Sequence, residues 1–598
     1  MRLAATRVTA RLTARPRHRA AAAMAPSATT AAPTDAYADL TARLTELSAL
    51  SSVESLLGWD EMVMLPPGDA AAELRGAQKA AMAGVVHGKA TAPELGAALA
   101  ALQVRGTRRE RERWGGVVCV GVDDLVFNLP PPFFPSQASP PADPVAAANV
   151  RLAARDYRRA TAIPADVAKE RALLESRAYA AWCAARAADD FALFEPELTN
   201  VFAMARRVAL LIEPATRTPY DVLLDEYEPG MTAARLEPIF AALEAAIVPL
   251  LALVRAKGAP PPRHPAAPAP YPKPAQAALC DAVVKALGFD TDAGRLDVSP
   301  HPFTGGTGPS DVRMTTRFKE GATLDDLAEG ITGATHECGH ALYEQGLPRG
   351  AQAGLPAGRA LSLGAHESQS LFWERCVGLS PAFSAWLAPQ IAAAFPDAPA
   401  PSPAQLYASF NELKTPSHIR VEADELHYPL HIILRFRLER AVVEGRLAVA
   451  DLPAAWDDAA EAMLGARPPS PAKGVLQDMH WSSVVGYFPT YVLGALAASQ
   501  LFDTVVEALG GEDAVHADIE AGRFGRLKAW LNDNVHARGA RDASLDEWLT
   551  AITGRPLDAA PLINHLARKV VAVYALDEGE AAAAVAEGLK QAAALGGK

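Results

Sequence analysis

The strongest chemical signal in this sequence is a pair of histidines four residues apart with an acid beside them. Residues 336–340 read His-Glu-Cys-Gly-His, an H-E-x-x-H motif. Four helical residues turn by about 400°, so both imidazoles leave one face of a helix about 6 Å apart along its axis. That spacing suits two ligands of one Zn²⁺ ion, with Glu337 beside them to handle a water molecule. His336 and His340 are therefore candidate metal ligands, against the alternative of two histidines satisfied in a core.

A zinc site of this kind needs a third protein ligand and an open position for water. Candidates lie in residues 364–370 (GAHESQS), which open an amphipathic helix predicted to run to about Val377. Glu367 follows His336 by 31 residues, so a helix–loop–helix return could bring it to the metal. Spacing alone leaves His366 as a rival ligand, and an ordinary surface helix start as the alternative to both.

The helix that must carry the two histidines has its own start and stop signals. Thr323 and Asp326 resemble a capping box, and Gly346 followed by Pro348 ends the helix. Cys338 lies inside this helix, and we expect it to be structural because the x positions of the motif tolerate many residues.

Helical periodicity continues through most of the chain. Leucines recur at three- and four-residue spacing from Tyr37 onward, and Ala-rich amphipathic stretches cover residues 70–103, 165–212, 233–257 and 275–287. Strand-like alternation is scarce, and the best candidate is the short segment Val312–Arg317. These patterns predict an all-α or nearly all-α architecture.

Length and composition limit the domain count less firmly. A chain of 598 residues could hold about four domains. Residues 105–146, with a charge run and several prolines, are interpreted as a surface insertion or a gene-model artefact, and residues 259–274 as a Pro-rich surface connection. Neither segment has the length or composition shift of a true domain boundary. We therefore expect residues 35–598 to form a single catalytic unit.

Residues 1–34 differ from the rest in composition. They hold six arginines, many Ala and Thr, and no acid. This composition is typical of an organelle transit peptide, for chloroplast or mitochondrion; a disordered basic tail or a misassigned start codon is the alternative, and the protein is then cytoplasmic. Removing this segment moves the formal net charge from −12 to −18.

Composition excludes several classes of protein. Half of the residues are hydrophobic and 21% are charged, which excludes global disorder. The acidic balance argues against a nucleic-acid binder. Five scattered cysteines with no C-x-x-C pair favour a reducing compartment. The charge-free run Val484–Phe502 contains a proline and a glutamine, so we interpret it as buried core rather than a membrane span.

Several short motifs occur in one order along the chain. They are HPF at 301–303, DVRMT at 311–315, HECGHALYEQGLP at 336–348, HESQSLFWE at 366–374, IRVEAD at 419–424, GVLQDMHW at 474–481 and GYFPTY at 486–491. Weaker similarity lies at 56–67, 149–161 and 182–191. Together they resemble the thermostable carboxypeptidase Taq type of metallopeptidases, metallopeptidase family 32, over most of residues 37–598.

The resemblance implies a mostly helical fold with a deep substrate groove, similar to neurolysin and angiotensin-converting enzyme. It implies a metal-dependent carboxypeptidase, commonly homodimeric, that uses Zn²⁺ or alternatively Co²⁺. By motif position, His336, His340 and Glu367 are then the metal ligands and Glu337 the catalytic base. The partners are peptides with a free C-terminus, with no nucleic acid and no membrane.

This sequence departs from the family pattern at three places. One residue is inserted between the H-E-x-x-H helix and Glu367, and the loop Ser482–Val485 is about one residue short. Pro429 occupies a position where the family usually has a residue that does not break a helix. These departures affect local geometry and specificity rather than the metal ligands.

Peptide hydrolysis also needs a donor for the oxyanion besides the metal. His480, Tyr487 and Tyr491 are the candidates, because related helical peptidases place a His and a nearby Tyr there. Ordinary core packing is the alternative for each aromatic side chain. His301 and Gln477 lie in family motifs, but no role follows from their chemistry.

An exopeptidase must further recognise a C-terminal carboxylate, which Arg binds by two parallel hydrogen bonds. Arg420 is the first candidate, Arg313 the second and Arg317 a distant third, against a solvated or structurally paired arginine. Two rival functions remain at this point: an endo-acting oligopeptidase of the same clan, and an inactive helical scaffold or peptide-binding protein. The intact four-residue metal and base set argues against the scaffold.

Overall fold

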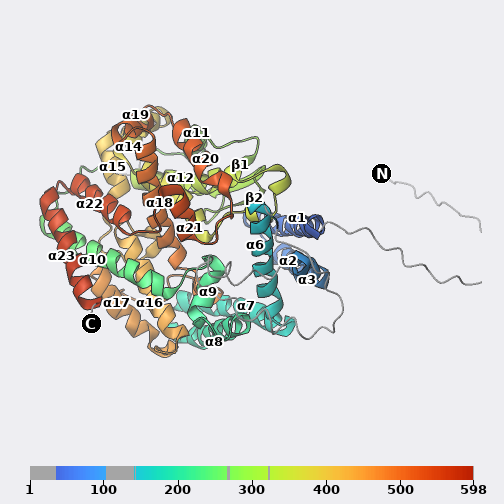
Figure 1. Ribbon diagram of the computed structural model, residues 1–598. Helices are drawn as coiled ribbons and strands as arrows, with labels where there is room; N and C mark the ends of the chain where they lie inside the picture. The colour runs from blue at the N-terminus through green and yellow to red at the C-terminus, as the bar shows by residue number, and fades with distance from the viewer. Residues whose placement is uncertain (1–35, 103–140, 142, 266–269, 321–322, 597–598) are drawn as a thin grey trace, which may run out of the picture.

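A computed structural model describes residues 36–102, 141, 143–265, 270–320 and 323–596. The described chain is mostly helical with one small sheet (Figure 1), so the mostly α prediction is confirmed. The proposed transit segment, residues 1–34, and most of the predicted insertion lie outside these ranges. The last residues of that insertion, from Asp143, open α6 (Pro144–Ala162), where the Asp143 side chain caps the helix by accepting from Ala146 N–H.

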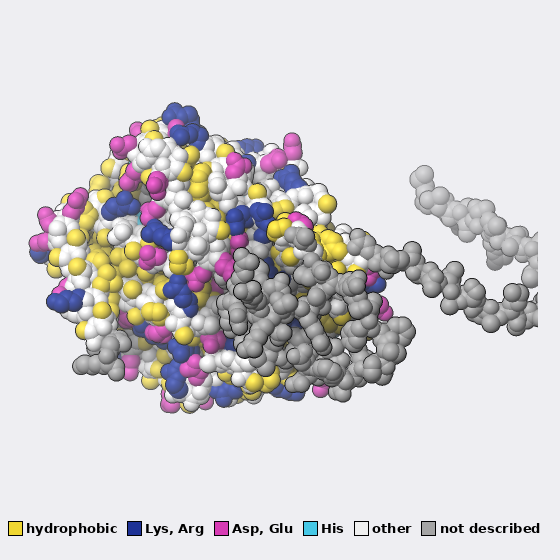
Figure 2. Space-filling model, in the orientation of Figure 1, with side chains coloured by type: hydrophobic (Ala, Val, Ile, Leu, Met, Phe, Trp, Pro, Cys, Tyr) yellow, Lys and Arg dark blue, Asp and Glu magenta, His cyan; other side chains and the backbone are white. Residues whose placement is uncertain are grey.

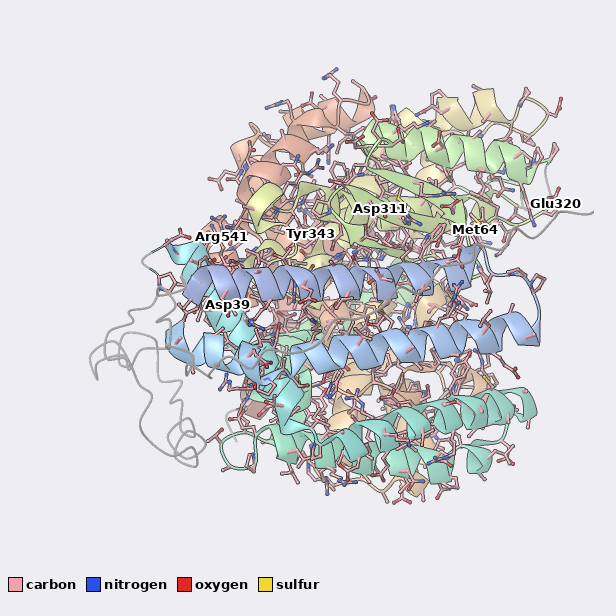
Figure 3. The ribbon with its side chains drawn as sticks, turned by 90° about the vertical axis from the view of Figure 1, so that its right-hand side faces the viewer. Asp39, Met64, Asp311, Glu320, Tyr343 and Arg541 are labelled. Carbon is pink, nitrogen blue, oxygen red and sulfur yellow. The ribbon has the colours of Figure 1, made fainter. Side chains whose placement is uncertain are left out.

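The N-terminal helices form a separate layer on one side of the molecule. Figure 3 shows α1 (Ala36–Val63) and α2 (Asp69–Ala90) running side by side across that side, α1 from near Asp39 to near Met64. Helix α1, together with α3 (Pro93–Leu102) and α6, buries a small hydrophobic cluster, to which Leu355 from outside these helices also contributes. The cluster comprises Leu40, Leu44, Leu95, Ala98, Leu99, Leu102, Val150, Ala153, Ala154 and Leu355.

The remaining helices pack around one large core that runs from Val167 to Ala581. They are α7 (Ala165–Ala188), α8 (Glu195–Ile212), α9 (Pro219–Tyr227), α10 (Ala233–Lys257), α11 (Lys273–Leu287), α12 (Leu324–Gly346), α13 (Leu363–Leu371), α14 (Pro381–Ala394), α15 (Pro403–Asn411), α16 (His427–Val443), α17 (Leu452–Leu464), α18 (Pro489–Ala508), α19 (Glu512–Glu520), α20 (Gly525–Asn534), α21 (Leu545–Thr553), α22 (Ala560–Tyr574) and α23 (Glu578–Gly596). The stretches predicted at 233–257 and 275–287 are found as single helices, α10 and α11, whereas those predicted at 70–103 and 165–212 are each divided into two helices, α2 with α3 and α7 with α8.

The sheet has three strands in the order β1-β3-β2. The predicted strand is found as β3 (Asp311–Thr316), which pairs parallel with β1 (Gly294–Val298) and antiparallel with β2 (Thr304–Gly308). Sequence analysis missed β1 and β2, and the sequence of β2, TGGTG, has no alternation of apolar side chains to signal a strand. As an edge strand, β2 contacts both α1 and α12.

Trp59 of α1 joins the N-terminal layer to this sheet. Trp59 is 5% exposed, and two guanidinium carbons lie over its ring, that of Arg295 at 5.2 Å and that of Arg313 at 4.6 Å from the ring centroid. The two arginines are direct register partners on β1 and β3. This double cation–π contact fixes the end of α1 against the strands beside α12.

The long apolar run lies inside the fold. Residues Pro489–Phe502 belong to α18, which is buried along most of its length and lies in the middle of Figure 1. Among the described helices, α10 alone has the length and hydropathy of a membrane span, and α18 with α19 passes only as a pair bent by 96°. Ten side chains of α10 are buried in the core, so packing accounts for its hydropathy.

Charged side chains are interspersed on the surface that Figure 2 presents, with Lys and Arg next to Asp and Glu over the main helical body.

Inside the fold, Pro429 does not break α16, because it is the third residue of the helix. The first backbone N–H groups of a helix have no partner within it, so a proline there costs no hydrogen bond. This departure from the family pattern is therefore structurally harmless.

Candidate metal centre

The helix α12 positions both histidines of the H-E-x-x-H motif. It begins at Leu324 behind the predicted capping box, in which Thr323 and Asp326 each accept from the other's backbone N–H, and it ends at Gly346. Gly339 faces α13 at very close range: a Cβ there would lie 2.5 Å from the carbonyl oxygen of Gln369. A side chain at this x position of the motif would therefore push the second ligand-bearing helix away.

Glu367 reaches the same place from α13. This short helix is capped by Ser362 and continues as a π-helical turn over Phe372–Gly378. Its other side packs on α18, where a Cβ on Gly494 would lie 2.5 Å from Cγ of Glu367. Gly339 thus allows α13 to approach α12 closely, and Gly494 leaves room for the Glu367 side chain beside α18.

Three ligand atoms converge between these helices. One atom each of His336, His340 and Glu367 lies within 4.8 Å of the others. Oε2 of Glu367 is 3.8 Å from Nε2 of His336 and 3.4 Å from Nε2 of His340. Ligands of one tetrahedral zinc ion, each about 2.0–2.2 Å from the metal, lie about 3.3–3.6 Å apart. Two imidazole nitrogens and a carboxylate oxygen therefore fit a single zinc ion with little adjustment.

The other ring nitrogens are held so that Nε2 faces the centre. Nδ1 of His336 is 2.7 Å from Oε2 of Glu374, and Nδ1 of His340 donates to the carbonyl oxygen of His366 at 3.1 Å. Metal-binding histidines usually have such a partner on the second nitrogen, which sets their tautomer and orientation. The rival ligand His366 has its own contact, Nε2 to Glu344 at 2.9 Å, and lies behind His340.

The pKa values of the two histidines in this cluster shift in opposite directions. Burial opposes the charged form of His336, but Glu367, Glu374 and Glu337 raise its pKa to about 9. Burial lowers the pKa of His340 below its usual value. Burial would raise the pKa of Glu367, yet the two imidazoles hold it below its usual range. The carboxylate is therefore ionised and available as a ligand at neutral pH.

The candidate base Glu337 lies on the same helix and is held from the sheet. The hydroxyl of Thr304, the first residue of β2, donates to its Oε2 at 2.6 Å and lies 3.0 Å from its backbone carbonyl. Glu337 is 6% exposed, whereas the side chains of His336 and His340 keep 23% and 16% of their exposure. The two imidazoles thus remain partly exposed beside a buried carboxylate.

The predicted oxyanion donors cluster beyond the ligands. Nε2 of His480 is 3.1 Å from the hydroxyl of Tyr491, and the rings of Tyr487 and Tyr491 meet edge to face at 5.5 Å. Burial lowers the pKa of His480 to about 4 and raises the pKa of both tyrosines, with Glu367 contributing to the latter. All three side chains are therefore neutral hydrogen-bonding groups at pH 7, and both phenols lie within electrostatic reach of Glu367.

The three arginine candidates have different surroundings. Arg420 is 5% exposed, and its Nε and Nη2 donate to Asp478 at 3.1 and 2.8 Å. Its guanidinium carbon lies 5.0 Å from the ring centroid of Tyr491. Arg313 pairs with its neighbour Asp311 and stacks on Trp59, and Arg317 pairs with Glu329 at the surface. Of the three, only Arg420 contacts the cluster of candidate oxyanion donors.

The two motif residues without a predicted role have clear structural ones. Oε1 of Gln477 accepts from Arg420 N–H at 2.8 Å, and its Nε2 donates to the carbonyl of His418 at 2.9 Å, which ties two motif segments together. His301 is exposed, and its carbonyl accepts from the hydroxyl of Ser299 at 2.6 Å.

Sequence analysis missed three residues of this site. Glu374 follows Glu367 by seven residues, two helical turns, so helical spacing could have revealed it. Arg375, next to it, is buried, contributes to the lowered pKa of Glu367, and lies 4.5 Å over the ring of Tyr428. Thr304 follows the HPF motif directly, but its contact with α12 depends on strand β2, which has no sequence signal.

A buried acid also supports the start of α13. Glu228, at the C-terminal end of α9, is fully buried, and its Oε2 accepts from the N–H of Gly364 at 3.1 Å. Burial raises the pKa of this carboxyl from 4.5 to about 8. Between these pH values the unfolded chain has released a proton that the folded protein retains, so the free energy of unfolding falls as the pH rises.

We expect Glu228→Gln to remove this loss of stability. The difference in stability between variant and native protein should shift in favour of the variant by roughly 2–4 kcal/mol from about pH 5 to about pH 8. Thermal unfolding at both pH values measures it. The exposed Glu170, changed to Gln, serves as the control. A stability difference between Glu228→Gln and native protein that is independent of pH would contradict the assignment.

Comparisons with known proteins match most of the chain. Residues 39–570 match the family model for carboxypeptidase Taq (M32) metallopeptidase. Thermostable carboxypeptidase 1 of Thermus thermophilus is 37% identical over 91% of this chain and 99% of its own length. Carboxypeptidase 1 of Bacillus subtilis is 39% identical over 71% of this chain and 83% of its own. The crystal structure of the M32 carboxypeptidase from Deinococcus radiodurans is also similar, with a TM-score of 0.79 and 34% sequence identity. The match covers 90% of this chain and 100% of the Deinococcus chain.

Proposed function

Because this chain belongs to the carboxypeptidase Taq (M32) family and is a metallocarboxypeptidase, we propose that its metal is Zn²⁺ held by His336, His340 and Glu367. The donor set supports zinc, since two imidazole nitrogens and one carboxylate oxygen are ligands that it prefers in catalytic sites, with Co²⁺ as the alternative. When bound, a zinc ion supplies Lewis acidity, which polarises the scissile carbonyl and makes a coordinated water more acidic.

The chain's own residues then divide the remaining work. Glu337, oriented by the hydroxyl of Thr304, takes a proton from the attacking water and returns it to the leaving amine. His480, Tyr487 and Tyr491 remain neutral and offer N–H and O–H groups to the carbonyl oxygen as it gains negative charge. Glu374 keeps Nε2 of His336 directed at the metal.

Arg420 is our first proposal for the group that binds the substrate's C-terminal carboxylate, and Arg313 is the second. Arg420 supports this role better because its charge is fixed among the candidate oxyanion donors. Burial opposes that charge, but Asp478 raises the pKa of Arg420 well above its usual value. The single observation that carries the whole proposal is the convergence of His336, His340 and Glu367 on one point.

Amidation of a peptide's C-terminus tests the exopeptidase proposal directly. Removing one partner of a buried, hydrogen-bonded charge pair costs about 2–5 kcal/mol, so we expect kcat/KM to fall at least about 30-fold for the amide. The free acid of the same sequence is the control, and a chelator should abolish cleavage of both until Zn²⁺ is restored. Equal cleavage of acid and amide would establish an endo-acting enzyme instead.

Two further proposals concern the whole protein rather than the site. We propose that residues 1–34 direct the enzyme to chloroplast or mitochondrion, on the basis of six arginines without an acid. Since α1 begins at Ala36, removal of this segment leaves the first helix whole. We also propose a homodimer, as the family resemblance implies, and a reducing compartment, which suits the four free cysteines among the described residues.

A further inference from the structure

Helix α16 carries a line of buried polar side chains behind the segment that contains His480. The line comprises His427, His431, Arg435 and Glu439, each four residues after the last, and each is at most 1% exposed. Residues at this spacing lie on one face of a helix. Arg435 donates to Asp478 from Nε at 2.7 Å. This face of α16 therefore contacts the segment Asp478–Gly486 through Arg435.

Glu439 makes the second contact and makes it at two residues at once. Its Oε1 accepts from the indole N–H of Trp481 at 3.1 Å and from the backbone N–H of Gly486 at 3.0 Å. Its Oε2 accepts from the hydroxyl of Tyr220 at 3.1 Å. Oε1 thus joins the two ends of the short loop Trp481–Gly486, whereas Oε2 bonds to Tyr220, which lies outside the loop.

The loop has little freedom to make this closure in another way. Gly486 has a φ of +86°, and a Cβ there would lie 2.9 Å from the backbone of Leu223 and Leu224 in α9. Glycine is needed both for the left-handed conformation and for the close approach. Because Gly486 is fixed against α9, the carboxylate determines where the other end, Trp481, lies relative to it.

The two residues that Glu439 holds are direct neighbours of candidate oxyanion donors. His480 precedes Trp481, and Tyr487 follows Gly486. The ring of His480 lies 5.5 Å from that of Tyr487 across the closed loop. A change in the position of either loop end would alter this separation, and with it the alignment of both groups toward a substrate carbonyl.

We propose that Glu439 is a positioning residue of this peptidase, which sets the relative placement of His480 and Tyr487 by closing the loop 481–486. The proposal rests on the function proposed above for those two side chains. Glu439 acts through the loop and contacts neither substrate nor metal. Its effect should therefore appear in the chemical step rather than in substrate binding or metal content.

Three variants separate the two oxygens of Glu439. Glu439→Leu removes both loop bonds and should lower kcat on the order of 10²-fold, the cost of misplacing catalytic groups by about 1 Å, with KM within about twofold and zinc content unchanged. Glu439→Gln retains an acceptor oxygen and should recover kcat to within about fivefold. Tyr220→Phe removes only the bond outside the loop and should leave kcat unchanged. A wild-type kcat in the leucine variant would overturn the proposal.

A double-mutant cycle distinguishes positioning from a general loss of structure. In a His480→Ala background, Glu439→Leu should cost less than about fivefold, because the group that it positions is already gone. Equal losses in both backgrounds would overturn the proposal while leaving the role of His480 intact. A wild-type kcat for His480→Ala would instead overturn the oxyanion assignment itself. If Glu439→Leu does not fold, Trp481→Phe, which removes one loop N–H and keeps the carboxylate, takes its place in the cycle.

Discussion

Glu337→Gln should lower kcat by roughly 10³-fold while zinc content stays at the wild-type level. General acid–base catalysis contributes about 10²–10⁴-fold, and Glu337 performs both proton transfers in the proposed reaction. Glutamine has the same size and keeps an oxygen to accept from Thr304, so α12 and the ligands should not move. Steady-state kinetics on a free-acid peptide, with metal analysis of the same preparation, measure both quantities.

The control for this experiment lies on the same helix. Glu329 is exposed near the start of α12, seven residues before His336, and pairs with Lys319 at 3.0 Å. Glu329→Gln makes the same chemical change without removing a proton acceptor from the site, and its kcat should be unaltered. Unchanged hydrolysis by Glu337→Gln would exclude this residue as the base.

Asp478→Asn should destabilise the protein by about 3–5 kcal/mol, the cost of breaking a buried charge pair on one side. The Asp478 carboxylate compensates two buried guanidinium groups, Arg420 at 2.8 Å and Arg435 at 2.5 Å. Asparagine keeps the shape but not the charge, so both arginines would be left with a neutral partner. Urea or thermal unfolding of the metal-loaded proteins measures the loss.

The pH dependence of the Asp478→Asn defect and a variant of an exposed ion pair serve as checks on this prediction. Burial would raise the pKa of Asp478, but Arg435 and Arg420 hold it well below the ordinary 3.8. Its stabilisation is thus fully present above about pH 4 and is lost only as the pH falls through the lower folded-state pKa, so the defect of the asparagine variant should be constant from pH 5 to 8. Asp281→Asn, which breaks an exposed pair with Lys285, should cost less than about 1 kcal/mol. A similarly small cost at Asp478 would contradict the assignment.

The parts of the site that sequence analysis predicted are those encoded locally. The capping box at Thr323, the four-residue histidine spacing and the stop at Gly346 all act within one helix, and each is found where it was expected. Glu367 needed more, because spacing left His366 open. In the structure both ring nitrogens of His366 are engaged elsewhere, Nε2 with Glu344 at 2.9 Å and Nδ1 with Nδ1 of His340 at 2.6 Å, whereas the Glu367 carboxylate faces Nε2 of both histidines.

The parts that could not be predicted depend on packing between distant segments. Thr304 reaches Glu337 only because the glycine-rich strand β2 lies beside α12, and no apolar pattern marks that strand. Arg420 was predicted from its motif, but its pairing with Asp478, 58 residues later, follows from tertiary structure. Glu439 has no sequence signal at all, since its partners come from α9 and the 481–486 loop. The arginine in a sequence motif was thus recognisable, but the pairs that charged residues form were not.

The small hydrophobic cluster of the N-terminal helices has a consequence for how this enzyme loses structure. It is separate from the main core and contains ten residues, whereas the main core extends over most of the chain. Regions with few buried contacts open at lower free energy than the global transition, as partial unfolding units. Here that unit contacts edge strand β2, whose Thr304 holds Glu337. We therefore expect loss of activity on heating to precede the main unfolding transition, because Thr304, which holds the proposed base Glu337, lies in the strand that contacts this unit.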